Sequence, residues 1–185
     1  TMIQRMAEDG LLGRAEYHAL DAEVENIRAA RVDLADWARA RGYTVAESPQ
    51  GLRLQAGEED VRITLQAEDL FRFLPREERS QRWDVLVANA FLDLVDVPAV
   101  LPRLRGLVKP GGLLYFSINF DGLTALEPVL DPVLDEKIIR LYHRSMDERQ
   151  VGGNHSGDSR AGRHLFSHLR AAGVELLEAG SSDWL

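Results

Sequence analysis

The chain has 185 residues, of which 45% are hydrophobic and 28% are charged, and its formal net charge at pH 7 is −8. This composition is typical of a globular domain, and the acidic balance disfavours DNA or RNA as a partner, because nucleic-acid binding depends on clustered lysine and arginine. The sequence has no cysteine, no signal-peptide pattern and no apolar run long enough to span a bilayer, so we expect a cytoplasmic protein without disulfides or thiolate metal sites.

The first predicted elements are a helix, a short strand and a longer helix. Apolar residues near helical spacing predict that the chain opens on a helix. A strand is predicted at residues 16–20, followed by Asp21 and a second helix that ends near Gly42. The apolar face of this second helix is predicted from residues at three- and seven-residue steps: Val24, Ile27, Leu34 and Trp37.

Residues 43–73 change to a strand pattern. Two alternating runs flank the turn at residues 49–51 and predict a hairpin, because Pro followed by Gly favours a chain reversal. An acidic turn at residues 57–60 leads into a third run. That run ends in Glu68 and Asp69.

The most informative stretch is residues 82–120, RWDVLVANAFLDLVDVPAVLPRLRGLVKPGGLLYFSINF. Two apolar strand-like runs, residues 84–89 and 113–119, are separated by an amphipathic helix and a Lys-Pro-Gly-Gly turn. Proline cannot continue the helix, and the glycines supply backbone angles that a side chain resists. Buried strands that alternate with helices predict an α/β fold whose parallel sheet is covered on both faces. The helix is predicted to bury Leu101, Leu104 and Leu107.

This stretch resembles the fourth strand, the following helix and the fifth strand of class I S-adenosylmethionine-dependent methyltransferases, and the KPGG turn is the sharpest part of the likeness. The resemblance implies a three-layer, Rossmann-like, mostly parallel sheet in a single domain over residues 1–185, in which residues 121–160 form a substrate-covering insertion. It implies S-adenosylmethionine as the cofactor and a small-molecule methyl acceptor as the partner, with no nucleic acid and no membrane. It leaves a homodimer open.

The resemblance also implies the residues that bind the nucleoside. Asp21, followed by Ala22, matches the acid that holds both ribose hydroxyls, although Asp is also a favoured helix cap and the two roles are compatible. Asp69 matches the acid that meets the adenine amino group, with the backbone amide of Leu70 on a ring nitrogen. Glu68 is the alternative acid if the register shifts, and a solvated acidic turn is the alternative to both.

Three residues at the end of the 84–89 strand match the family's lining of the methionine moiety and the methyl group: Asn89, Ala90 and Phe91. An asparagine supplies both an acceptor and a donor without adding charge. The alternative is a turn residue that bonds its own backbone. We favour the role in which Asn89 faces the cofactor, because the carboxyl ends of the strands are the functional edge of this topology.

The candidates for catalysis are His143, which lies beside Tyr142 in a predicted helix, and His155, which lies in a polar loop with Asp158 and Arg160. An oxygen acceptor commonly needs a general base, whereas a thiolate does not. Core packing for Tyr142 and simple exposure for His143 are the alternatives.

A further pair, His164 and His168, stands one helical turn apart and could chelate a metal. The glutamate of an H-E-x-x-H helix is missing, however, because position 165 is leucine. We therefore predict no metal site. The helix that carries the pair is predicted to be capped by Asp158 or Ser159 and to be followed by a sixth strand, VELLEA, at residues 174–179.

Two departures from the family are evident. The sequence contains no GxGxG loop, and it lacks the first strand and the seventh strand of the family, so we expect a sheet that is incomplete at both ends and a chain that is part of a longer protein. A nicotinamide-dependent oxidoreductase would need the same glycine loop, and its short-chain type needs Tyr-x-x-x-Lys, which is also absent. The remaining alternative is a methyltransferase-like domain without catalysis that serves in binding or oligomerisation.

Overall fold

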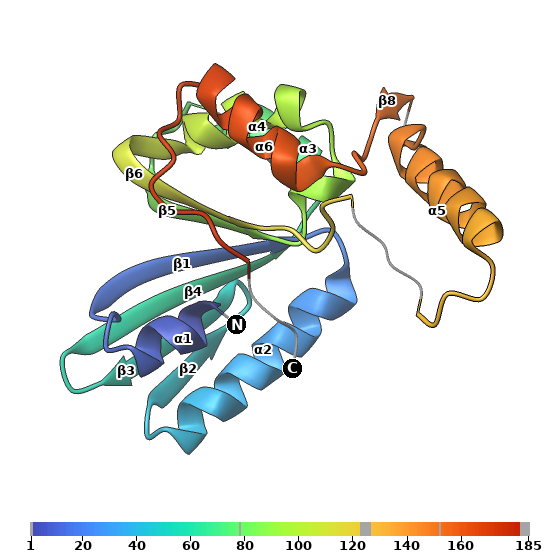
Figure 1. Ribbon diagram of the computed structural model, residues 1–185. Coiled ribbons are helices and arrows are strands. Elements are labelled where there is room, and N and C mark those ends of the chain that lie inside the picture. The colour runs from blue at the N-terminus through green and yellow to red at the C-terminus, as the bar shows by residue number, and fades with distance from the viewer. Residues whose placement is uncertain (1, 78, 123–126, 152, 182–185) are drawn as a thin grey trace. The chain divides into compact units, whose positions relative to one another are not determined.

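The computed structural model describes residues 2–77, 79–122, 127–151 and 153–181 (Figure 1). The chain divides into two compact units, Thr1–Arg76 and Glu77–Leu185, and each is described by itself. Residues 123–126 and 152 of the predicted insertion lie outside the described residues.

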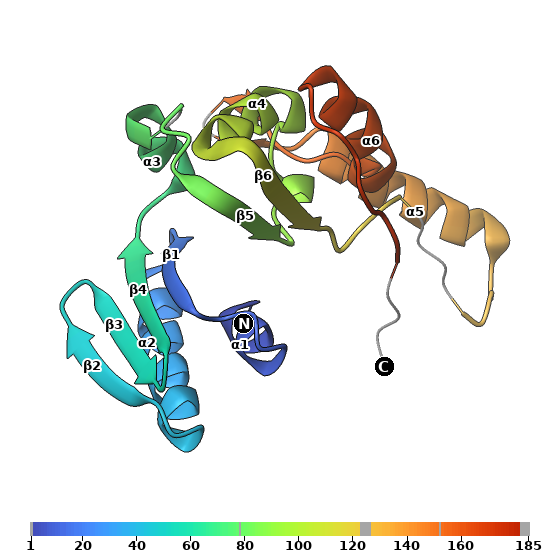
Figure 2. The ribbon, with the colours of Figure 1, turned by 90° about the vertical axis from the view of Figure 1, so that its left-hand side faces the viewer.

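The first unit is a four-stranded sheet with the helices α1 (Met2–Glu8) and α2 (Val24–Ala40) on one face (Figures 1 and 2). Its strand order is β1–β4–β3–β2, in which β1 and β4 are parallel and the other neighbours are antiparallel. The elements in chain order are α1 (Met2–Glu8), β1 (Arg14–Asp21), α2 (Val24–Ala40), β2 (Thr44–Ser48), β3 (Gly51–Ala56), β4 (Glu59–Ala67) and α3 (Leu70–Glu77).

The core of this unit follows from the alternation along β3 and β4. Leu54 and Ile63 point into the core, whereas Arg53 and Arg62 are exposed on the opposite face. The buried face packs against helix residues that include Ile3 of α1 and three of α2, namely Leu34, Ala35 and Ala38. A sheet with one apolar and one polar face needs helices on one side only. The first unit is therefore built of two layers.

The second unit contains a two-stranded parallel sheet, a separate short hairpin and three helices. Its elements are β5 (Trp83–Asn89), the 3₁₀ turn η1 (Leu92–Leu94), α4 (Val97–Leu107), β6 (Val108–Ser117), α5 (Pro132–Asp147), β7 (Gln150–Val151), β8 (Asn154–His155) and α6 (Ala161–Ala171). The helix α4 contacts β5, β6 and α6.

The start and the buried face of α4 have clear local causes. Asp96 caps the helix, and its Oδ1 accepts a hydrogen bond from the Ala99 N–H at 3.2 Å. The predicted buried stripe is confirmed, because Leu101, Leu104 and Leu107 are each at most 3% exposed. This helix forms the centre of the second unit's core.

The α/β class is confirmed, but the prediction of a three-layer, mostly parallel Rossmann-like sheet is wrong. The structure has a mixed four-stranded sheet with one parallel pair, and β5 and β6 form a separate two-stranded sheet. The hairpin of β2 and β3 extends the sheet beside β4, where β3 pairs with β4 in antiparallel orientation. The polar outer faces of β3 and β4 also leave no apolar surface for a third layer.

Two local predictions are also wrong. Residues 174–179 are not a strand, and Leu176 and Leu177 are 48% and 67% exposed. The KPGG segment lies within β6, where the pairing shifts from Trp83↔Val108 to Val85↔Leu113 and the extra residues form a bulge. Gly111 has φ +78°, which explains why glycine suits this bulge.

No helix in the described ranges is long and apolar enough to cross a membrane.

Candidate functional site

The parallel pairing of β1 and β4 brings the acids at their ends to one edge of the first unit's sheet. Asp21 is the last residue of β1 and pairs with Ala67, the last residue of β4. The N–H of Glu68 donates to the backbone oxygen of Asp21 at 2.9 Å. Since carboxyl ends of parallel strands meet at the same edge, the carboxylates of Asp21, Glu68 and Asp69 share this rim.

The carboxylate of Asp21 holds the start of α2. Its Oδ1 accepts from the N–H of Glu23 at 2.8 Å, and its Oδ2 accepts from the Nδ2 of Asn26 at 3.1 Å. Both contacts are exposed to solvent. Ala22 is the exposed link between the acid and the N-cap residue Glu23. Each carboxylate oxygen accepts more than one hydrogen bond, so Asp21 retains capacity for a ligand hydroxyl.

Asp69 caps α3. Its Oδ1 accepts from the N–H groups of Phe71 at 2.8 Å and Arg72 at 3.3 Å. The N–H of Leu70, the first residue of the helix, makes none of the hydrogen bonds found among the described residues. A first-turn N–H without an intrahelical partner is free to donate to a ligand.

Glu68 is engaged differently from Asp69. Its two oxygens form a bidentate pair with the guanidinium of Arg76, at 2.8 and 2.5 Å, and one of them also accepts from Gln66 at 2.6 Å. The hydrogen bonds from Arg76 are the main cause that lowers the pKa of Glu68 below its ordinary value. This carboxylate is therefore a structural anchor for α3.

Sequence reasoning missed a polar chain on the outer face of this sheet. The Nε2 of His18 lies 2.8 Å from the Oε1 of Gln66, and the Nε2 of Gln66 donates to the Oε2 of Glu68 at 2.6 Å. The His18 ring also meets Phe73 edge to face, with centroids 5.6 Å apart. The signal was the register of β1 and β4, because Leu20 pairs with Gln66 and His18 precedes Leu20 on the same face.

In the second unit, Asn89 ends β5 beside the end of β6. Its Oδ1 accepts from the Oγ of Ser117 at 3.1 Å, and the N–H of Ala90 donates to the backbone oxygen of Ser117 at 2.8 Å. Ala90 has φ +50°, a sparsely populated conformation for a residue with a side chain. Phe91 is the N-cap residue of η1. The ends of β5 and β6 are thus joined by hydrogen bonds between Asn89, Ala90 and Ser117.

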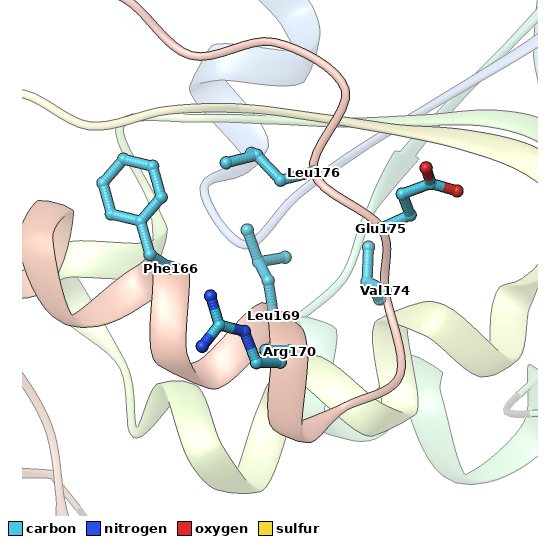
Figure 3. Close-up of a pocket in the computed structure, with 6 residues that line it drawn as sticks. All are labelled: Phe166, Leu169, Arg170, Val174, Glu175 and Leu176. Atoms are coloured by element: carbon cyan, nitrogen blue, oxygen red, sulfur yellow. The ribbon is translucent and has the colours of Figure 1, made fainter.

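The second unit also contains a pocket of about 290 Å³ between α6 and the segment after it (Figure 3). The pocket has mostly apolar walls with one arginine and one glutamate, and its lining consists of Phe166, Leu169, Arg170, Val174, Glu175 and Leu176. None of the predicted site residues lines it.

The two predicted catalytic histidines have different surroundings. The ring of His143 lies 5.6 Å from that of Phe120 between centroids, and its Nε2 is buried without a partner among the described groups, as is the Oδ1 of Asp93. The ring of His155 is exposed, and its Nε2 lies 2.8 Å from the backbone oxygen of Asp147. The Nε2 of His143 is therefore shielded from solvent, whereas the ring of His155 is exposed.

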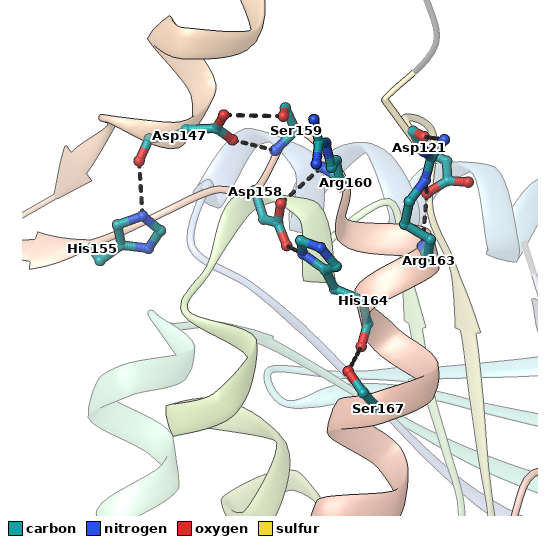
Figure 4. A network of polar contacts seen from close by, with 9 residues as sticks. All are labelled: Asp121, Asp147, His155, Asp158, Ser159, Arg160, Arg163, His164 and Ser167. Carbon is teal, nitrogen blue, oxygen red and sulfur yellow. Dashed lines mark hydrogen bonds and ion pairs between the residues drawn. The ribbon is translucent and has the colours of Figure 1, made fainter.

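The loop that carries His155 is held by side-chain contacts that the sequence did not predict (Figure 4). The carboxylate of Asp147 accepts from the N–H of Ser159 at 2.8 Å and from its Oγ at 3.1 Å, and Ser159 is 2% exposed. The Oγ of Ser156 donates to the backbone oxygen of Leu94 at 2.6 Å. These two serines fix the loop against α5 and η1.

The start of α6 is held by a residue distant in sequence. The residue before the helix, Arg160, makes no side-chain cap, and the Oδ1 of Asp121 accepts from the N–H of Arg163 at 2.7 Å instead (Figure 4). The predicted caps act elsewhere, because Ser159 bonds Asp147 and Asp158 accepts from the N–H of Arg160 at 2.8 Å. The helix N-terminus is thus already satisfied by a carboxylate.

No group of three or more metal-ligating side chains gathers among the residues that the structure describes. Comparisons of the chain with protein-family models, with curated proteins and with solved structures gave no match. The contacts described above are therefore the basis for a functional assignment.

Proposed function

We propose that this protein is an S-adenosylmethionine-dependent methyltransferase that acts on a small-molecule acceptor. The observation that carries the proposal is the shared rim of β1 and β4, where Asp21 ends one of two parallel strands and Asp69 follows the other. This support is independent of the overall sheet, because it needs one parallel pair and the acids at its end.

The residues of the rim fit the nucleoside half of the cofactor. Asp21 would accept hydrogen bonds from the ribose hydroxyls, since its exposed carboxylate oxygens have remaining acceptor capacity. Asp69 would accept from the adenine amino group, and the N–H of Leu70 would donate to a ring nitrogen. The assignment of Asn89, Ala90 and Phe91, which belong to the second unit, stays a prediction from the resemblance and is not part of this argument.

The bound cofactor would supply an activated methyl group for in-line displacement by a nucleophile of the acceptor, so the protein mainly aligns the reactants and excludes water. His155 is the better of the two candidate bases. The carbonyl of Asp147 can only accept, so the Nε2 of His155 carries the proton and the Nδ1 keeps its lone pair. That nitrogen could remove a proton from an oxygen acceptor.

Calorimetric titration with S-adenosylmethionine and S-adenosylhomocysteine tests the proposal. We expect Asp21→Asn and Asp69→Asn to weaken binding by about 10- to 100-fold each, because hydrogen bonds to charged groups contribute about 1.5–3 kcal/mol. Asp33→Asn is the matched control, since Asp33 is an exposed acid of α2 outside the rim. Absence of binding by the unmodified chain would remove the methyltransferase proposal.

A second candidate function is a domain without catalysis that serves in binding or oligomerisation. The observation that favours it is the exposed apolar face of the second unit's sheet, where Val85, Leu113 and Tyr115 are 44–48% exposed on the same face. The helix α5 is also largely unpacked, because none of its residues is buried.

Sedimentation at several protein concentrations tests the second candidate. A self-associating domain would show a mass that rises with concentration, and the double variant Leu113→Ser, Tyr115→Ser would reduce that rise, because it removes apolar surface from the contact. A monomer at every concentration, together with cofactor binding, would favour the methyltransferase.

A further inference from the structure

Two histidines lie on one side of α6, outside the proposed cofactor site. His164 and His168 are four residues apart in the helix, so their side chains lie one turn above the other. Their rings meet edge to face with centroids 6.3 Å apart and an interplanar angle of 76°. Neither residue has a part in the proposed methyl transfer.

The ring of His164 is oriented by a carboxylate. Its Nδ1 lies 2.6 Å from the Oδ2 of Asp158, while the other oxygen of Asp158 accepts from the N–H of Arg160 at 2.8 Å (Figure 4). The side chain of Asp158 is 25% exposed and that of His164 is 48% exposed. The carboxylate is thus fixed by the backbone, and the imidazole is fixed by the carboxylate.

This contact decides which nitrogen of His164 can bind a metal. An ionised carboxylate can only accept, so the Nδ1 carries the proton and the Nε2 keeps its lone pair. In metal-binding histidines, the ring nitrogen that does not bind the metal often donates to a carboxylate. That contact orients the ring and raises the basicity of the metal-binding nitrogen. Sequence reasoning considered the histidine pair without this partner, because Asp158 lies before the helix.

We propose that His164 and His168 form a binding site for a divalent transition metal, with Asp158 as the positioning residue. Metal–nitrogen bonds are about 2.0–2.1 Å long. The 6.3 Å between the ring centroids is therefore close to the largest separation that one ion can bridge, and binding needs a rotation of the rings toward each other. The two imidazoles supply part of a coordination shell, and water or a group from another molecule completes it.

The ligand type determines which ions fit. Imidazole suits Cu²⁺, Ni²⁺ and Zn²⁺, and among these Cu²⁺ is expected to bind most tightly. Mg²⁺ prefers oxygen ligands in near-octahedral geometry, so it should not compete. The proposal does not depend on the methyltransferase function, because the site shares no residue with the rim of β1 and β4.

Isothermal titration with Cu²⁺, Zn²⁺ and Mg²⁺ tests the site in a buffer that does not bind these ions. We expect saturable binding of Cu²⁺ and Zn²⁺ but not Mg²⁺, and we expect His164→Ala and His168→Ala each to remove it. Asp158→Asn should weaken binding by about 10- to 100-fold, as removal of an outer-shell carboxylate does. Asparagine keeps an acceptor for the N–H of Arg160, and the contact between Asp121 and the N–H of Arg163 at the start of α6 is unchanged.

His155→Ala is the matched control, because His155 is an exposed histidine whose ring contacts a backbone oxygen instead of this pair. Circular dichroism without metal should be the same for all variants, since they alter a partly exposed surface. Perturbation of the His164 and His168 ring resonances by Zn²⁺ would support the proposal independently. Equal binding by the double variant His164→Ala, His168→Ala, or no saturable binding by the unmodified chain, would overturn it.

Discussion

The two units of the chain hold their segments in place by different means. In the first unit, one apolar cluster connects α1 and α2 to the sheet, and it includes Ile3, Leu34 and Leu54 at 2% exposure or less. In the second unit, α4 is well buried, but the loops around α5 and α6 are fixed by Asp121, Asp147 and two buried serines.

The two units thus illustrate two ways of determining a structure, by apolar burial and by directional hydrogen bonds. Apolar burial is not directional, and it stabilises whatever arrangement removes the most surface from water. A carboxylate that accepts two backbone or hydroxyl hydrogen bonds fixes one geometry of a loop. The first unit should therefore respond most to changes of volume, and the second unit's loops to changes of hydrogen-bonding capacity.

The largest expected effect is in the core of the first unit. Leu54→Ala should lower the free energy of unfolding by about 2–5 kcal/mol, because Leu54 is 0% exposed and the change leaves a cavity. Urea denaturation followed by circular dichroism measures this change. Leu130→Ala is the control, because Leu130 is 87% exposed and should alter stability by at most about 0.5 kcal/mol. Equal effects would contradict the proposed difference between core and surface.

Gly51→Ala should also destabilise the first unit, by about 1–3 kcal/mol or more, because overpacking forces the backbone to shift. An added Cβ would lie 1.8 Å from the backbone oxygen of Ile63. Thermal unfolding measures the effect. Gly13→Ala is the control, since its Cβ would meet nothing within 4 Å. If both variants melt alike, the close approach of β3 and β4 is not a constraint.

In the second unit, Asp121→Ala should cost about 0.5–2 kcal/mol, which is typical for the loss of a helix cap. The variant leaves the N–H of Arg163 without its acceptor. Hydrogen exchange at the first turn of α6 reports the change locally. Asp121→Asn keeps an oxygen acceptor and should lose less than the alanine variant. A uniform rise in exchange over the whole unit would show that Asp121 does more than cap the helix.

The smallest expected effect is electrostatic and concerns the first unit. The hydrogen bond to Glu59, together with burial, raises the pKa of Tyr43 to about 12. A raised pKa means that the folded state retains the proton longer, so this contribution to stability is present below pH 10 and is lost as the pH rises through 12. Ultraviolet titration, with Tyr43→Phe as the difference reference, should locate this ionisation, and Glu59→Gln should return it toward the ordinary value. An ordinary pKa for Tyr43 in the unmodified chain would contradict the contact.

Most of the elements were predictable because their patterns are local. The opening helix, the strand at residues 16–20, the hairpin and the stripe of α4 all follow from apolar spacing and from turn residues. The predicted strand at residues 174–179 failed because an apolar pattern becomes a strand only when a partner strand supplies its hydrogen bonds. The arrangement of strands was predicted by likeness to a family, and the polar outer faces of β3 and β4 exclude that arrangement.

The candidate sites were predictable only in part. The acids at the ends of β1 and β4 could be expected to meet, because parallel strands bring their carboxyl ends together. The bonds of Asp121 to Arg163 and of Asp147 to Ser159 join residues 42 and 12 positions apart, and no local periodicity encodes them. The orientation of His164 by Asp158 likewise depends on how the loop enters the helix.

The contact of Asp121 with Arg163 joins two points of the chain that are 42 residues apart. The segment between these residues, which includes α5, is an excursion whose two ends are tied together beside α6. The entropy of closing such a segment grows slowly, by about 0.6 kcal/mol for each doubling of its length. The part of this segment around α5, which has no buried residue, can therefore be lengthened or shortened in engineered sequences, provided that the contacts of Ser156 and Ser159 are kept.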